Sequence, residues 1–361
     1  MNTLESKIKF SQSSSQKIIK LISEIDMFKG KWSVLENMSI TFLNELRNIA
    51  TIQSIGSSTR IEGANLSDQD IKELIAELDI NKLDTRDEQE VVGYYDTLEL
   101  IFENYREIEL TENYIKQLHS RLLKYSVKDD RQRGIYKKLT NKVVATYPNG
   151  AQKVIFNTTE PSLVPKEMEE LITWTNQCVR ENKIHSLIVI GLFIYEFLSI
   201  HPFHDGNGRL SRLLTNLLLL KQDYNFIKYV SFEHLIEERK KNYYTALMEC
   251  QQSRNTDNER IDIWIIFFLD SIKNLSEKLE NKIKDIALTK SIYLNERQKQ
   301  IIGFVEKNEL CKIGDIHRNF SDISINTLKK DMKYLVENNI LDKTGQRKGT
   351  IYRLNYSEGK A

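Results

Sequence analysis

Helix-breaking residues are scarce in this chain, and their scarcity is the feature that most limits its fold. Only four prolines and 14 glycines occur among 361 residues. Both residue types interrupt helices, proline by removing a backbone donor and glycine by raising the entropic cost of ordering. The chain is therefore expected to be mainly α, and its apolar content of 40% is enough for a real core.

Apolar residues recur at three- and four-residue spacings in many segments, which predicts amphipathic helices. In the first 290 residues we expect helices at 40–56, 68–79, 112–126, 165–182, 186–200, 209–221, 233–252 and 259–287. Ser67 and Asp70 together resemble a capping box at the start of one of them. The most apolar run, 187–200, contains Glu196 and is too short for a membrane span, so we expect a buried core helix.

One hairpin interrupts the predicted helices. β-Branched and aromatic residues gather at 143–144 and at 154–156, on either side of a Pro-Asn-Gly turn at 148–150. Two such runs around a turn predict a β-hairpin.

The segment from about 291 onwards has a different pattern. Helices are expected at 295–308, 312–318 and 324–338, followed by strand, glycine-containing turn and strand within 340–354. Three helices and a β-wing predict a winged-helix domain, and the expected division is 1–110, 111–288 and 289–361. Basic residues outnumber acidic ones in 324–353. We expect this tail to contact DNA through phosphates, or another protein, and the sequence does not choose between them.

Charge and cysteine usage exclude several classes of protein. A net charge of +1 gives no general preference for nucleic acid or membrane. Cys178, Cys250 and Cys311 are far apart and show neither zinc-site nor disulfide spacing. The first 17 residues lack the apolar stretch of a secretory signal. We expect a cytoplasmic protein with no membrane partner.

A polar loop that contains glycines follows the apolar helix, and it reads HPFHDGNGRLSR from His201 to Arg212. Glycines let backbone N–H groups converge on one anion, and the N-terminus of the next helix adds a positive dipole end. Arg209 and Arg212 share a helix face, and each can hold a phosphate. Asp205 offers an oxygen ligand for Mg²⁺, and His201 is suited to accept a proton. The loop alone predicts a triphosphate, magnesium and a base.

The same loop resembles the Fic family signature, HxFxDGNGRxxR, at every fixed position. The resemblance implies a Fic-fold helical bundle and adenylylation, the transfer of AMP from ATP to Ser, Thr or Tyr hydroxyls of target proteins and of the enzyme itself. It implies that His201 is the catalytic base and that Asp205 holds Mg²⁺. It assigns ATP binding to Asp205, Gly206, Asn207, Gly208, Arg209 and Arg212, with the Asn207 side chain on the α-phosphate and the arginines on the β- and γ-phosphates. Relatives that act as kinases carry Lys where this chain has Gly208, so Gly208 favours AMP transfer.

A second resemblance concerns regulation. Residues 58–63, Ser-Thr-Arg-Ile-Glu-Gly, are similar to the inhibitory motif of Fic proteins that carry their own inhibitor. The resemblance implies that Glu62, with Ser58 in the same motif, pairs with Arg212 and denies it to the γ-phosphate. Taken alone, the segment is more typical of a helix end with Gly63 as its cap, and its occurrence with the complete signature favours the inhibitory motif.

The resemblance also suggests secondary contacts. The hairpin stands where the family has its target-docking flap, which gives Val154, Ile155 and Phe156 as candidates for strand addition. Tyr244 and Gln251 are the candidates for the adenine pocket.

Two other functions stay open at this stage. One is a DNA-binding regulator whose Fic core only senses nucleotide, and the other is a transferase of a different nucleotide-derived group, such as UMP or phosphocholine. The sequence does not identify the target, the modified residue, the signal that releases Glu62, a homodimer or a reverse reaction that removes AMP.

Overall fold

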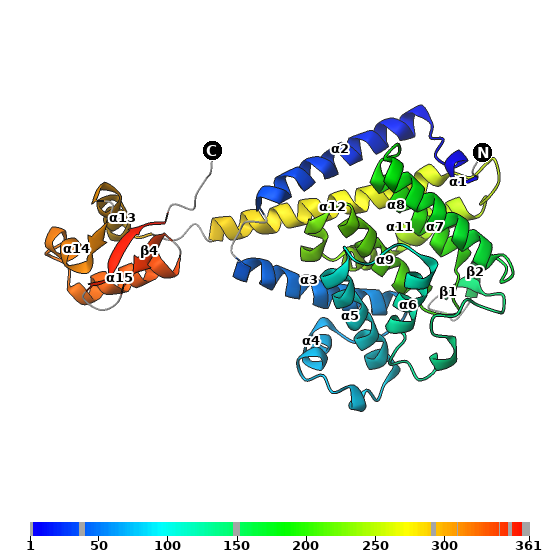
Figure 1. Ribbon diagram of the computed structural model, residues 1–361, viewed down its shortest axis with the longest axis horizontal. Coiled ribbons are helices and arrows are strands. Elements are labelled where there is room, and N and C mark those ends of the chain that lie inside the picture. The colour runs from blue at the N-terminus through cyan, green and yellow to red at the C-terminus, as the bar shows by residue number, and fades with distance from the viewer. Residues whose placement is uncertain are drawn as a thin grey trace. The chain divides into compact units, whose positions relative to one another are not determined.

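The computed structural model describes residues 3–35, 40–146, 152–289, 294–308, 310–338, 340–345 and 349–355. Helices dominate these residues, which confirms the mainly α prediction (Figure 1). The chain divides into two compact units, Met1–Glu280 and Asn281–Ala361. None of the described helices combines the length and apolar character needed to cross a membrane.

The first unit is a bundle of helices connected by short loops. Its helices are α1 (Thr3–Ser6), α2 (Gln12–Leu35), α3 (Ile40–Ile61), α4 (Asp68–Ala76), α5 (Arg86–Asn104), α6 (Glu112–Leu122), α7 (Val164–Glu181), α8 (Ser186–Ile200), α9 (Asn207–Lys221), α10 (Phe232–Glu238), α11 (Lys240–Gln251) and α12 (Ile261–Thr289).

Helices α8 and α9 form the centre of this bundle. The residues from Val189 to Ile200 on α8 are all buried, as are those from Arg209 to Leu220 on α9. Each fully buried large apolar side chain contributes about 1.5–3 kcal/mol, so these two helices, which are buried on nearly all sides, are held firmly in the core. Helix α12 is tied to α8 by Trp264, whose indole N–H donates to the Gly191 carbonyl at 2.7 Å. The loop between α8 and α9 is therefore anchored at both ends.

Helices α5 and α6 cross very closely. A Cβ atom added to Gly93 of α5 would lie only 2.1 Å from the Leu122 carbonyl oxygen of α6. Only glycine permits this approach, and it brings α6 within reach of the loop between α8 and α9.

Long helices α2 and α12 lie alongside each other (Figure 1), with Lys273 paired to Glu24 and Lys31 paired to Glu280.

The capping box predicted at the start of α4 is confirmed. The Ser67 hydroxyl accepts from the Asp70 N–H at 3.2 Å, and the Asp70 carboxylate accepts from the Ser67 N–H at 2.9 Å.

Residues 233–252 are helical as predicted, and the helix expected at 239–252 within them is α11; the chain divides into α10 and α11 at Arg239. This residue has φ −105° and ψ 22°, outside helical geometry. Its guanidinium lies 2.8 Å from the Asp270 carboxylate and 3.2 Å from the Ser271 hydroxyl on α12. These contacts to another helix stabilise a break that the local pattern does not reveal.

The predicted hairpin is present as β1 (Lys142–Thr146) and β2 (Gln152–Asn157), paired antiparallel. The register pairs Val143 with Phe156 and Val144 with Val154, so Ile155 forms a bulge. The predicted turn at 148–150 lies outside the described residues.

The second unit contains three helices and a small sheet. Its elements are α13 (Glu296–Asn308), β3 (Cys311–Lys312), α14 (Ile313–Asn319), α15 (Ile325–Glu337), β4 (Leu341–Thr344) and β5 (Ile351–Leu354). The antiparallel sheet has the order β3-β5-β4. The predicted helices and two strands are confirmed, whereas β3 was not predicted, because a two-residue strand exists only through its partner β5.

Candidate active site

His201 closes α8 with a left-handed backbone of φ 52°. Its Nδ1 lies 3.3 Å from the Leu198 carbonyl oxygen. A carbonyl only accepts, so Nδ1 carries the proton and Nε2 is left as an acceptor. Burial lowers the pKa of the imidazole to about 4, and the Lys137 charge lowers it further against the opposing effect of the Leu198 carbonyl. His201 is therefore a neutral base above about pH 5.

The loop after His201 turns sharply at Gly206, which has φ 79°. The Gly206 N–H donates to the Asp205 carboxylate at 2.6 Å, and the Gly206 carbonyl accepts from Leu210 in the first turn of α9. Asn207 joins the two sides of the loop, because its Oδ1 accepts from the Phe203 N–H at 2.9 Å and its Nδ2 donates to the Phe203 carbonyl at 2.8 Å. Asn207 thus braces the loop, and its assignment to the α-phosphate stays a prediction.

Arg212 is almost fully buried at 2% exposure and is held by the C-terminal end of α3. Its Nε donates to the Ser58 hydroxyl at 2.8 Å, and its Nη2 donates to the Ser58 carbonyl at 2.9 Å and to Glu62 Oε1 at 2.7 Å. Burial alone would raise the pKa of the Glu62 carboxyl, but the charge and hydrogen bond of Arg212 hold it below its usual value. Ser58, Glu62 and Arg212, which the resemblance to the inhibitory motif links, are therefore in direct contact.

Glu62 also covers the backbone at the start of α9. A Cβ atom added to Gly208 would lie 2.3 Å from Glu62 Oε1 and 3.4 Å from Arg212 Nη1. The carboxylate therefore lies where the first turn of a helix attracts anions. Because α3 ends at Ile61 and Gly63 has φ 109°, residues 58–63 form the end of a helix. The same residues also bind Arg212.

Arg209 is equally buried, at 1% exposure, but it is paired differently. Its guanidinium lies 3.0 Å from Glu90 Oε2 and 3.2 Å from Asp205 Oδ1. Glu90 is in turn 2.7 Å from Arg86 Nε, and Arg86 Nη2 lies 3.3 Å from Asp205 Oδ2. Within the described residues, Arg209 Nε and Nη1 make no well-aligned hydrogen bond, so this guanidinium retains buried donors for an anion.

Asp205 fits the role of a magnesium ligand that shares the ion with phosphates. Burial alone would raise the pKa of its carboxyl, but the Arg209 charge and the Gly206 N–H keep it low, so the group is ionised. The described residues contain no cluster of three or more metal-ligating side chains. Mg²⁺ commonly takes one or two carboxylates and completes its shell with phosphate oxygens and water, which suits this single ligand.

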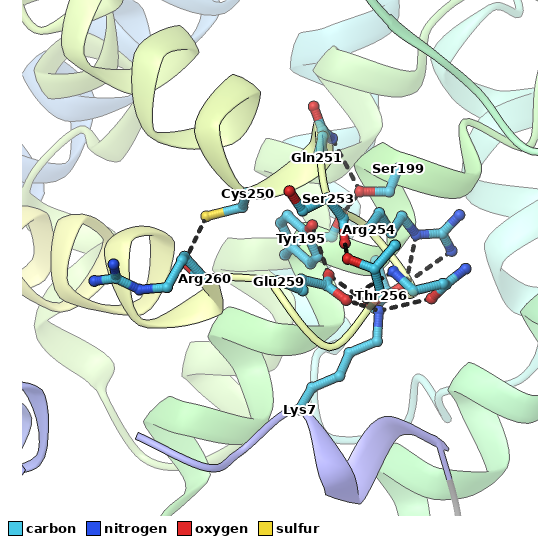
Figure 2. A network of polar contacts seen from close by, with 12 residues as sticks. Lys7, Tyr195, Ser199, Cys250, Gln251, Ser253, Arg254, Thr256, Glu259 and Arg260 are labelled. Carbon is cyan, nitrogen blue, oxygen red and sulfur yellow. Dashed lines mark hydrogen bonds and ion pairs between the residues drawn. The ribbon is translucent and has the colours of Figure 1, made fainter. Parts of the chain in front are cut away.

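A cavity of about 120 Å³ opens beside the loop, and Tyr244, Gln251 and Phe156 line it together with His201 and the glycine turn. Figure 2 shows Gln251 beside Ser199 of α8, to which its Nε2 donates at 2.9 Å. Its Oε1 is buried without a partner among the described residues, and so it remains available as an acceptor.

Of the three flap candidates, only Phe156 has a side chain that the structure describes. Phe156 contributes its side chain to the cavity. The side chains of Val154 and Ile155 lie outside the described residues.

The sequence did not reveal several groups that surround the loop. Glu90 and Arg86 come from α5, and His119 comes from α6, where it is 1% exposed and contacts the Asp205 carbonyl. Each lies more than 80 positions from its partner in the loop and belongs to no local motif. No signal in a single sequence could have selected these residues.

Comparison with known proteins finds a family that part of this chain resembles. Residues 109–219 match the model of the Fic/DOC family. The chain is 39% identical over 66 residues to a Fido domain-containing protein of Dictyostelium discoideum, covering 18% of this chain and 46% of that protein. It is 31% identical over 119 residues to protein adenylyltransferase Fic of Drosophila grimshawi, covering 33% of this chain and 22% of that protein. The matched regions thus span less than half of these curated relatives.

The fold has a full-length counterpart among solved structures. A Fic family protein from Desulfovibrio desulfuricans G20 superposes with a TM-score of 0.61 at 20% identity, covering 98% of each chain. At this identity, the likeness concerns the fold.

Proposed function

We propose that this chain, whose residues 109–219 match the Fic/DOC family model, is a protein adenylyltransferase that transfers AMP from ATP to hydroxyl side chains of target proteins and of itself. The observation that carries the proposal is the convergence of three elements on one loop. His201 presents Nε2 as a proton acceptor, the α9 N-terminus presents its glycine turn, and two buried arginines follow. The names of matched relatives, which include protein adenylyltransferase Fic, support the same chemistry.

The proposed reaction assigns one task to each group. His201 Nε2 accepts the proton of a Ser, Thr or Tyr hydroxyl, whose oxygen attacks the α-phosphorus while pyrophosphate leaves. The backbone amides of Gly206 to Gly208 and the α9 dipole stabilise the negative charge at the phosphates. Arg209 and Arg212 bind the outer phosphates. Mg²⁺, held by Asp205, would supply charge neutralisation at the phosphates.

The cavity suits a nucleotide whose base carries an exocyclic amine, as adenine does. The Tyr244 ring lines it, and the unpartnered Oε1 of Gln251 offers an acceptor for an exocyclic amine. Donors such as UTP or CDP-choline lead to different products, so the nucleotide must be tested directly. The other candidate is a DNA-binding regulator. Its Fic core would bind ATP without transferring AMP and would serve only as a nucleotide sensor.

We further propose that Glu62 inhibits the enzyme. The 2.7 Å ion pair with Arg212 occupies the guanidinium that the γ-phosphate needs. The same carboxylate lies over Gly208, where phosphate would approach the helix N-terminus. Two negative groups cannot share this position, so productive ATP binding requires Glu62 to leave.

The second unit is proposed to be a winged-helix module that binds DNA or protein. Helix α15 exposes Lys329, Lys330 and Lys333 on one side, while Leu328 and Met332 pack into the core of that unit. Gel-shift assays with random-sequence duplexes, compared with a Lys329, Lys330 and Lys333 triple-alanine variant, separate the two partners. If the wild type retards the duplexes and the variant does not, the partner is DNA. If neither protein retards them, the partner is another protein.

The test of the enzymatic proposal combines three variants with ATP labelled at the α-phosphate and Mg²⁺. Glu62→Gly should incorporate label into itself with a mass gain matching AMP. Adding His201→Ala to that variant should abolish incorporation, and His317→Ala in α14 serves as the matched histidine control. Absence of any mass gain in Glu62→Gly, with ATP binding still measurable, would contradict the proposal and favour another donor or the sensor.

A further inference from the structure

His119 is a buried imidazole on α6 that contacts the loop and is not among the residues lining the cavity. Its Nδ1 accepts from the Gly134 N–H at 2.9 Å, and its Nε2 lies 3.0 Å from the Asp205 carbonyl oxygen. The ring stacks on Phe203 with centroids 3.7 Å apart and an interplanar angle of 6°. One side chain thus contacts the loop at two points.

These contacts determine which nitrogen of His119 carries the proton. The Gly134 N–H can only donate, so Nδ1 is unprotonated and accepts. The neutral ring then carries its proton on Nε2, which donates to the Asp205 carbonyl.

The bond to Asp205 acts on the peptide that starts the glycine turn. The Asp205 carbonyl and the Gly206 N–H belong to one rigid plane, so holding the oxygen also determines where the N–H points. A Cβ atom at Gly206 would lie 3.4 Å from His119 Nε2, which shows how closely the ring packs on the turn. The Gly206 N–H now donates to the Asp205 carboxylate, a group that Mg²⁺ would also engage. The His119 bond does not depend on that carboxylate.

We propose that His119 is a positioning residue that aims the backbone amides of the Gly206–Gly208 turn at the nucleotide phosphates. The inference rests on the proposed function for the identity of the ligand, but the orientation of the turn can be measured without any transfer of AMP. The backbone N–H groups that would bind the phosphates must be oriented in advance, because donors that are already oriented cost no reorganisation when charge develops. Phe203 supports the same turn through Asn207, so the stacked ring and the hydrogen bond act on both sides of the loop.

Three substitutions of His119 separate the hydrogen bond from the packing. His119→Gln retains an N–H donor at about the reach of Nε2. His119→Asn retains an acceptor for Gly134 but ends short of Asp205. His119→Phe retains the stacked ring and loses both bonds. Each is made in the full chain carrying Glu62→Gly, so that the ion pair with Arg212 does not mask ATP binding.

Two readouts are independent of catalysis, namely the Kd for ATP with Mg²⁺ by calorimetry and hydrogen exchange of the peptide that covers 203–209. We expect His119→Phe and His119→Asn to weaken ATP binding about tenfold and to speed exchange in this peptide, because each loses the hydrogen bond to the Asp205 carbonyl. His119→Gln should stay within about threefold of its parent. Thermal unfolding of every variant reports general damage.

The opposite results would overturn the inference. Unchanged ATP affinity and exchange in His119→Phe would show that the bond to Asp205 positions nothing. Equal losses in the Gln and Asn variants, tracking a common fall in Tm, would make His119 an ordinary core residue. If His119→Phe does not fold, the contrast between Gln and Asn decides alone. If the parent does not bind ATP, the proposed function fails separately, and slower exchange in the Gln variant than in the Asn variant still tests the positioning.

Discussion

Replacing Glu62 with glycine should activate the enzyme by a factor that the structure allows us to estimate. The contact to be removed is one charge-assisted hydrogen bond of 2.7 Å to an arginine that is 2% exposed. Such bonds contribute about 1.5–3 kcal/mol net. Since about 1.4 kcal/mol corresponds to a factor of ten, productive ATP binding should improve roughly tenfold to hundredfold. The effect should appear in kcat/KM for AMP transfer.

A glutamine at position 62 provides the matched comparison. It retains the size of the side chain and its place over Gly208 but loses the negative charge. A neutral hydrogen bond contributes only about 0.5–1.5 kcal/mol, so Glu62→Gln should be intermediate between wild type and Glu62→Gly. Initial rates of α-phosphate label incorporation at several ATP concentrations give the order and the magnitude.

The reasoning is refuted by a specific pattern of rates. If Glu62→Gly binds ATP but transfers AMP no faster than wild type, the ion pair does not limit catalysis. If Glu62→Gln equals Glu62→Gly, charge is the whole effect, and the position of the carboxylate over Gly208 is irrelevant.

Three further predictions concern other groups of the site. Because the pKa of His201 is lowered to about 4, kcat/KM should stay level as the pH falls from 8 to about 5 and should drop only near 4, when the base is protonated; a drop centred near 6.5 would contradict the burial argument. Glu90→Gln removes the more buried of the two carboxylates paired with Arg209 and should lower the free energy of unfolding by about 3 kcal/mol, measured in urea; a change below about 0.5 kcal/mol would show that Asp205 suffices. Ser58→Ala removes the acceptor of Arg212 Nε and should cost about 1–3 kcal/mol in the same assay, whereas equal stability would mean that water replaces the hydroxyl.

Several elements could be predicted because their causes are local. Helix α8 was predicted at 186–200 and is observed at Ser186–Ile200, since the apolar run and its flanks define both ends. The capping box at Ser67 also depends on neighbours three residues apart. The break at Arg239 could not be predicted, because its stabilising contacts come from Asp270 and Ser271 on another helix.

The amino-acid sequence by itself determined the chemical groups of this protein and the order in which they appear. A loop containing a histidine, an aspartate, two glycines and two arginines predicts a phosphate site through backbone geometry and charge, which are local properties. Only the tertiary structure decided the partners of these groups. Glu62 meets Arg212 across 150 residues, and His119 meets Asp205 across 86. Such contacts depend on how α3 and α6 pack against the central helices. The same packing removes water from His201 and so decides its protonation state, which the residue type leaves undetermined.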